Sequence, residues 1–287
     1  MKWRGRRVST NVDDRRGQSP RRGPVGRRGA GVGCGGLLLV LVLSFLTGND
    51  PLQLLEAIGG EQASTQGSGF PDVPSAPPQD ALGEFAGVVL AETEDTWNTL
   101  FRQMGRNYRE PTLVLFSGGV NSACGFNSSA VGPFYCPADS QVYLDLSFFD
   151  ELSRRFGAAG DFAQAYVIAH EIGHHVQNQL GISSQVAQMR QRSSQTQSNQ
   201  LSVRLELQAD CFAGVWGRFA YERNLLEPGD LEEAMRAAAA IGDDNIQRRS
   251  SGRIRPESWT HGSSEQRQEW LRRGLQSGDP QACETFQ

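Results

Sequence analysis

The spacing of apolar residues among polar ones along this chain predicts several helices and two short strands. The spacing of residues such as Phe85 and Trp97 predicts a helix over residues 82–104. Residues 112–116 form a continuous apolar run, which is typical of a buried strand. Over residues 141–146 apolar and polar side chains alternate, and this pattern predicts a second strand.

The second half of the chain is predominantly helical by the same criterion. Apolar residues surround a helix over 165–176, and a second core helix follows over 205–223. Two further helices are predicted over 231–241 and 265–275. Residues 185–200, rich in Gln, Ser and Arg, form either a mobile loop or an exposed helical extension. Together the segments indicate an α+β domain that is mostly helical and has a small sheet.

Charge is distributed unevenly along the chain. Residues 1–48 contain ten Lys or Arg and two Asp, a net charge of +8, so the remaining residues carry −12 to reach the total of −4. Residues 1–29 are rich in Gly and Arg, and we expect them to form a disordered basic tail. A nucleic-acid-binding arm is an alternative interpretation of this tail. An apolar segment follows this tail, so we interpret the tail as the cytoplasmic flank of a membrane helix and expect no nucleic-acid partner.

An uncharged segment, residues 30–46, follows the basic tail. We expect residues 30–48 to form a single transmembrane helix with the N-terminus in the cytoplasm. A cleaved signal peptide is the alternative, because the strongest apolar core is only about ten residues long. Residues 49–80 are rich in Gly, Ser and Pro and predict a linker. Residues 81–287 then form a periplasmic or extracytoplasmic domain.

The number and positions of the cysteines are consistent with a domain that is exported across the membrane. Cys124, Cys136, Cys211 and Cys283 lie in the predicted domain, and four cysteines in a translocated domain indicate two disulfides. Of three connectivities the simplest pairs Cys124 with Cys136 and leaves Cys211 with Cys283. Cys34, in the apolar segment, is expected to be unpaired. A thiolate zinc site is the alternative, but the chain has no Cys-x-x-Cys motif.

The main candidate chemistry is a His-Glu-x-x-His motif formed by His170, Glu171 and His174. Residues four apart share one face of a helix, so both imidazoles can bind one zinc ion. Glu171 is rotated about 100° from His170 and can instead take a proton from a zinc-bound water. His175 faces away from this pair. A chance match is the alternative, but three of the chain's four histidines gather here.

A further zinc ligand is expected, because catalytic zinc usually has three protein ligands and a water. Glu206 and Asp210 lie four residues apart in the core helix predicted over 205–223, where buried carboxylates need partners. Glu206 would bind the metal, and Asp210 would accept the outer N–H of a ligand histidine. The alternative is a solvated face of an amphipathic helix.

These motifs resemble the Glu-zincin metallopeptidases, whose third ligand opens a Glu-x-x-x-Asp motif. The chain is more closely similar to the bacterial membrane-anchored putative neutral zinc metallopeptidases, through residues 3–7, 132–137, 142–146 and 209–216. The resemblance implies a zincin-like fold, one Zn²⁺ ion, peptide substrates and an inner-membrane location. It also implies that residues 143–146 form an open edge that binds the substrate backbone by strand addition. An ordinary sheet strand is the alternative.

One late phrase extends the resemblance. In related membrane-embedded Glu-zincins, Thr-His-Pro followed by Arg lies near the active site. His261 and Arg267 match this phrase, whereas Gly262 takes the place of Pro and alters the loop. The resemblance implies that His261 stabilises the oxyanion and that Arg267 braces the site. A purely structural histidine is the alternative, and Ser263 is expected to cap the helix over 265–275.

The sequence therefore predicts a membrane-anchored zinc metalloendopeptidase. Its catalytic residues are Glu171 and His261, and its metal ligands are His170, His174 and Glu206. The alternative is a non-catalytic, zinc-stabilised extracytoplasmic binding or scaffold protein. Glu171 favours the enzyme, because a purely structural zinc site does not need a general base.

Overall fold

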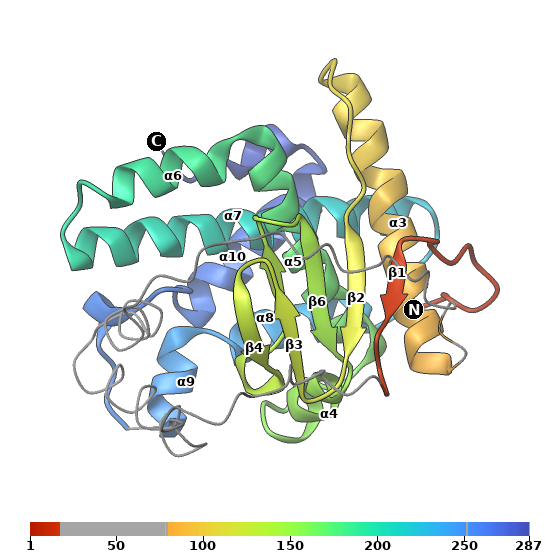
Figure 1. The fold of residues 1–287 in the computed structure, drawn as a ribbon, viewed down its shortest axis with the longest axis horizontal. Coiled ribbons are helices and arrows are strands. Elements are labelled where there is room, and N and C mark those ends of the chain that lie inside the picture. The colour runs from red at the N-terminus through yellow and green to blue at the C-terminus, as the bar shows by residue number, and fades with distance from the viewer. Residues whose placement is uncertain (18–77, 79, 251, 287) are drawn as a thin grey trace, which may run out of the picture. The chain divides into compact units, whose positions relative to one another are not determined.

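A four-stranded mixed sheet and a set of packed helices form the computed structural model, which describes residues 1–17, 78, 80–250 and 252–286 (Figure 1). The strand order is β1 (Val12–Asp14), β2 (Thr112–Phe116), β6 (Gln141–Asp145) and β5 (Phe134–Cys136). Strands β1, β2 and β6 run parallel, and β5 is antiparallel to β6. A separate hairpin consists of β3 (Gly119–Ser122) and β4 (Gly125–Ser128).

Most of the described chain is helical, and the mostly helical α+β prediction is confirmed. The longer helices are α3 (Ala81–Gln103), α5 (Asp161–Leu180), α7 (Gln195–Glu222), α8 (Asp230–Ala240) and α10 (Ser264–Ser277). The shorter helical segments are α4 (Ser147–Arg154), α6 (Ile182–Arg190), α9 (Asp243–Ser250), η1 (Ser129–Val131), η2 (Pro256–Ser258) and η3 (Pro280–Cys283).

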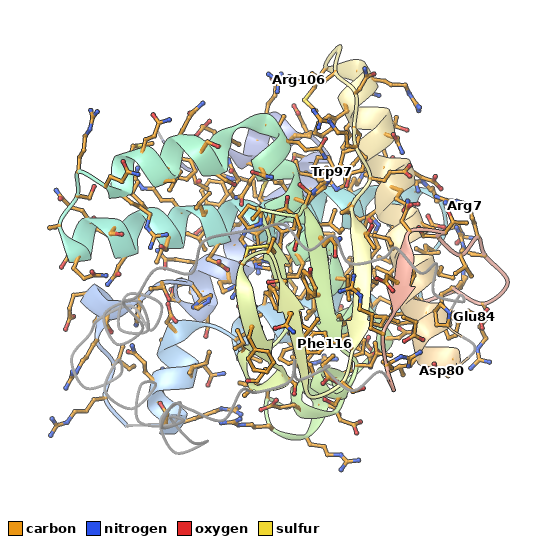
Figure 2. All side chains as sticks on the ribbon, viewed as in Figure 1. Arg7, Asp80, Glu84, Trp97, Arg106 and Phe116 are labelled. Carbon is orange, nitrogen blue, oxygen red and sulfur yellow. A yellow bond between two sulfur atoms is a disulfide. The ribbon has the colours of Figure 1, made fainter. Side chains whose placement is uncertain are left out.

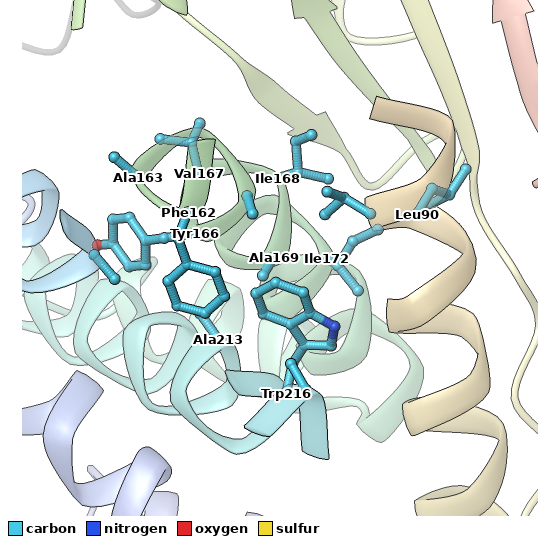
Figure 3. Close-up of a cluster of buried hydrophobic side chains, with 14 of the residues drawn as sticks. Leu90, Phe162, Ala163, Tyr166, Val167, Ile168, Ala169, Ile172, Ala213 and Trp216 are labelled. Atoms are coloured by element: carbon cyan, nitrogen blue, oxygen red, sulfur yellow. The ribbon is translucent and has the colours of Figure 1, made fainter. Parts of the chain in front are cut away.

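Helix α5 lies in the middle of the core and is apolar around most of its circumference. Figure 3 shows Ile168 and Ile172 on the side of α5 towards Leu90 of α3, and Phe162 beside Trp216 of α7. The rings of Phe162 and Trp216 are stacked, with centroids 5.5 Å apart. Burial of each such side chain contributes about 1.5–3 kcal/mol. This packing against both α3 and α7 fixes α5, which carries the His-Glu-x-x-His motif.

The polar segment over residues 185–200 is helical. It contains the end of α6 and the first turns of α7, so the exposed helical extension is the alternative that the structure supports. Ser194 begins α7 with a capping box, in which its side chain accepts from the backbone of Gln197. Ser263 caps α10 in the same way through Gln266, as the sequence predicts.

The sheet corrects the prediction of an open edge at residues 143–146. Strand β6, which contains Tyr143, is hydrogen-bonded to β2 on one side and to β5 on the other. Its backbone groups are therefore committed to neighbouring strands. The end of the sheet that lies beside α5 is β5, whose Tyr135 hydroxyl accepts a hydrogen bond from Asn178 at 2.9 Å.

The prediction of a disordered tail is wrong for residues 1–17, which we call the N-terminal strap. Strand β1 of the strap pairs with β2, and Lys2 N–H donates to the carbonyl of Leu225 at 2.7 Å. Arg7, shown beside α3 in Figure 2, forms an ion pair with the buried Glu94 at 3.0 Å. The strap thus completes the sheet and neutralises carboxylates that α3 buries.

The strap also bears on how the chain can be divided. The strap belongs to the same compact unit as residues 80–286. The topology predicted from the sequence, with a single membrane crossing between them, would place the strap and residues 80–286 on opposite sides of the membrane. Arg16 and Asp80 meet in an ion pair at 2.5 Å, next to the start of α3. The predicted anchor over 30–48, nearly all of the predicted linker over 49–80, and Cys34 lie outside the described residues. Among those that are described, no helix is long and apolar enough to cross a membrane.

Candidate zinc centre

Helices α5 and α7 bring three potential zinc ligands together. The ligand atoms of His170, His174 and Glu206 all lie within 4.8 Å of one another. The Nε2 atoms of His170 and His174 lie 3.2 and 3.4 Å from the two carboxylate oxygens of Glu206. The two helices approach closely because Gly173 has no side chain. A Cβ atom there would lie 2.9 Å from the carbonyl oxygen of Ala209.

The outer nitrogen of His170 faces Asp210, as the sequence predicts. Nδ1 of His170 lies 2.8 Å from Oδ1 of Asp210, which is fully buried. A carboxylate can only accept, so Nδ1 carries a proton, and Nε2 is the nitrogen that faces Glu206 and would offer its lone pair to a metal ion. Asp210 also accepts from the hydroxyl of Tyr166 at 2.5 Å and from Arg267.

The pKa values around His170 follow from burial and these charges. Burial alone lowers the pKa of His170, but the carboxylates of Asp210 and Glu206 outweigh it and raise that pKa to about 10. Burial alone raises the pKa of Asp210, but Arg267 and His170 outweigh it and the net shift is downward. The surroundings of His170 therefore favour an added positive charge, which a bound metal ion would supply.

The outer nitrogen of His174 faces a residue that the sequence analysis missed. Nδ1 of His174 lies 2.9 Å from Oε1 of Gln177, which is buried one turn further along α5. The amide oxygen accepts the Nδ1 proton, so Nε2 of His174 is again the nitrogen that faces Glu206. The sequence gives little sign of this role, because Gln177 is the first of three consecutive polar residues at the end of α5.

The two predicted catalytic residues lie in different surroundings. Glu171 follows His170 on α5 and is buried. His261 lies in the loop before α10 with its side chain half exposed, and it is close enough to Glu206 for the two charges to interact. The structure thus places Glu171 beside His170 on α5, and His261 within electrostatic range of Glu206.

The loop that carries His261 is held by Asp243, which the sequence analysis also missed. Oδ2 of Asp243 accepts from the backbone N–H groups of Thr260, His261 and Gly262 at 2.8, 2.6 and 2.9 Å. Its other oxygen lies 3.3 Å from Nδ1 of His261. Gly262 has a φ of +91°, a conformation that L side chains rarely adopt. Proline at this position, as in the related phrase, could not make this turn.

His175 faces away from the cluster, in agreement with the sequence. Its Nε2 lies 2.7 Å from the carbonyl oxygen of Arg109, and its Nδ1 lies 3.1 Å from the hydroxyl of Tyr135. Burial lowers the pKa of His175 to about 4. This histidine is neutral at neutral pH and joins α5 to β5 and to the segment before β2.

The structure contains both predicted disulfides. Cys124 is bonded to Cys136, which joins the β3–β4 hairpin to β5. Cys211 is bonded to Cys283, which joins α7 to the last described turn, η3. The second bond lies one residue from Asp210 and therefore close to the candidate centre.

The donor set fits zinc. The Nε2 atoms of two imidazoles and one carboxylate converge, which is a known ligand set of catalytic zinc. Both outer nitrogens are hydrogen-bonded, as is typical of histidines that bind metal. Calcium and magnesium prefer sites built of oxygen ligands only. A His-Glu-x-x-His helix packed on a Glu-x-x-x-Asp helix is the arrangement of the Glu-zincin class.

Comparison with known proteins gives the family. The chain belongs to the family described as "Putative neutral zinc metallopeptidase", whose model matches residues 1–286. It is 50% identical over 288 residues to the uncharacterized protein YpfJ of Escherichia coli K12, covering all of this chain and 99% of that protein. It is 44% identical over 213 residues to the uncharacterized protein Rv2575 of Mycobacterium tuberculosis, covering 70% of this chain and 71% of that protein. No solved structure matches the chain.

Proposed function

We propose that this protein is a zinc-dependent metalloendopeptidase that binds one Zn²⁺ ion through His170, His174 and Glu206. The observation that carries the proposal is the pair of outer hydrogen bonds, to Asp210 and to Gln177, which turn both Nε2 atoms towards the carboxylate of Glu206. The family membership supports the same class of protein.

Zinc bound there would supply a Lewis acid for the scissile carbonyl and would acidify a water. Glu171 takes the proton of the attacking water and passes it to the leaving amine. His261 donates a hydrogen bond to the oxyanion, and Asp243 holds the loop that presents it. Arg267 and Asp210 keep His170 in place.

Strand β5 is the structural candidate for the substrate-binding edge. It lies at the end of the sheet order, is bonded to β6 on one side, and contacts α5 through Tyr135. An extended peptide could add to this edge by backbone hydrogen bonds. We therefore transfer the predicted role of residues 143–146 to Phe134–Cys136.

An oxidising compartment is proposed for the described part of the chain, because it holds two disulfides and such bonds persist mainly outside the cytosol. The strap would lie in the same compartment, since it packs on α3 and α8. This placement does not agree with a single crossing by residues 30–48 and a cytoplasmic N-terminus. Attachment to the inner membrane through that segment stays a prediction.

The test uses the full chain, because truncation before residue 81 would remove the strap. Wild type and Glu171→Gln are compared for zinc content and for cleavage of unfolded casein, with and without a chelator. The proposal expects one zinc per chain in both proteins and chelator-sensitive cleavage by wild type alone. Zinc in both without cleavage in either favours the non-catalytic scaffold. A folded wild type without zinc overturns the proposal.

A further inference from the structure

A chain of buried amides connects the candidate ligand His174 to the Cys211–Cys283 disulfide. Oε1 of Gln177 lies 2.9 Å from Nδ1 of His174, and Nε2 of Gln177 donates to Oε1 of Gln208 at 3.1 Å. Nε2 of Gln208 donates to the carbonyl oxygen of Cys283 at 2.9 Å. Gln177 and Gln208 are 1% and 3% exposed, and Cys283 is fully buried, so water does not compete for these bonds.

The direction of every bond in this chain is fixed by backbone carbonyls. Cys283 offers only an acceptor, so the amide nitrogen of Gln208 must face it and the amide oxygen must face Gln177. Gln177 also donates to the carbonyl of Leu205 at 2.7 Å, which fixes its own nitrogen a second time. The oxygen of Gln177 is then the atom left for His174, and it can accept but not donate.

This polarity decides which nitrogen of His174 carries the proton. Because Gln177 can only accept there, a proton is held on Nδ1, and Nε2, which faces Glu206, is the nitrogen that would offer its lone pair to a metal ion. The reverse tautomer would place two acceptors face to face in a buried site and leave both unsatisfied. The acceptor that holds the Nδ1 proton is a carboxylate, Asp210, for His170. For His174 it is an uncharged amide, Gln177.

We propose that Gln177 and Gln208 are positioning residues for the zinc ligand His174, and that the Cys211–Cys283 disulfide supports zinc binding by fixing the carbonyl that orients them. The disulfide holds η3 on α7, which places that carbonyl against Gln208. This inference rests on the zinc site of the proposed function. It adds that part of the zinc affinity is set by residues that touch neither the metal nor the substrate.

The test measures zinc dissociation constants of the full chain by competition with a chromophoric chelator. Gln177→Leu removes the acceptor, and we expect about 10- to 100-fold weaker zinc binding. Gln177→Glu keeps an acceptor and should bind zinc close to wild type, although it lowers stability by leaving Leu205 and Gln208 without a donor. Gln179→Leu, on the same helix but bonded to His175 and Arg109, is the matched control and should leave the affinity unchanged.

The disulfides supply a second matched pair. Replacement of Cys211 and Cys283 by Ser should weaken zinc binding in the same direction as Gln208→Leu, whereas replacement of Cys124 and Cys136 should not. The visible spectrum of the cobalt-substituted protein should change in Gln177→Leu and not in Gln179→Leu, because it reports the ligand field.

The possible outcomes distinguish the positioning role of Gln177 and Gln208 from the zinc site itself. A wild type that binds zinc with the same affinity and the same cobalt spectrum as Gln177→Leu overturns the positioning role and leaves the zinc site intact. Equal affinities in the two disulfide variants overturn the role of Cys211–Cys283. A folded wild type that binds no zinc overturns the proposed function itself.

Discussion

Arg267 and Asp210 form a buried ion pair with two hydrogen bonds. Nε and Nη2 of Arg267 donate to the two oxygens of Asp210 at 2.8 and 2.9 Å, and the two side chains are 2% and 0% exposed. The pair joins α10 to α7 directly behind His170. Such a pair is costly to bury, but its members satisfy each other and fix the carboxylate that His170 needs.

Removal of one member should therefore destabilise the fold strongly. Arg267→Met leaves Asp210 buried without its counter-charge, and we expect a loss of about 3–5 kcal/mol in the free energy of unfolding. Urea unfolding of the metal-free protein measures it. Arg272→Met, on the exposed face of the same helix, is the control and should cost little. Equal stabilities of the two variants would contradict the prediction.

Asp243 should matter for turnover and not for zinc binding. Asp243→Ala removes the acceptor of three backbone N–H groups and should free the loop that carries His261. If His261 stabilises the oxyanion, kcat should fall by up to about 10²-fold, towards the value of His261→Ala. Steady-state kinetics with a zinc titration alongside would check this. A variant with unchanged kcat would remove Asp243 and His261 from the mechanism together.

The strap should be required for the stability of α3. Glu94 is 1% exposed, and its recorded partners Arg7, Ser9 and Asn11 all belong to the strap. Replacing Ser9 and Asn11 by Ala should cost about 1–3 kcal/mol, because a buried carboxylate loses two donors. Thermal or urea unfolding measures the loss. Asn98→Ala, which removes a bond to the exposed Glu110, serves as the comparison and should be nearly neutral.

Acid should loosen the start of α3 before it unfolds the core. The hydrogen bond from Arg16 lowers the pKa of Asp80 from 3.8 to about 2. Between these values the unfolded chain binds more protons at this site than the folded one, so stability is present above pH 3.8 and is lost as pH falls towards 2. Asp80 is half exposed, so the contribution is below about 1 kcal/mol.

Asp80→Asn isolates this contribution, because asparagine still caps a helix but does not titrate. The difference between the unfolding free energies of wild type and variant should be largest at pH 5 and should shrink steadily as pH falls towards 2. A constant difference across that range would show that the ion pair with Arg16 does not stabilise the folded state.

The sequence predicted the helices well because their patterns are local. The helix with His170 is apolar around most of its circumference and is uninterrupted by proline, and the helix with Glu206 also shows helical spacing of its apolar residues. The four-residue intervals in both helices also placed the candidate ligands on facing sides. Packing of α5 on α7 then needs only Gly173, which the motif itself contains.

The position of the strap and the identity of the edge strand could not be predicted from such local patterns. The strap resembles a disordered tail by composition, and its partners elsewhere in the fold lie 64 or more residues away. Its one sequence signal was the presence of Glu92 and Glu94 within an apolar helix, where buried carboxylates require cations from elsewhere. Strand β5 has three residues, too few for an alternating pattern, so the strand order was not visible.

The strap is separated from its partners by long stretches of chain. Strand β1 can pair with β2 only after residues 112–116 have been made, and Met1 contacts Asp230, a residue 229 positions later in the chain. At about 5–20 residues per second, a ribosome needs roughly 10 to 50 s to add those 229 residues. The contact between Met1 and Asp230 can therefore form only after α5 and α7 have been synthesised.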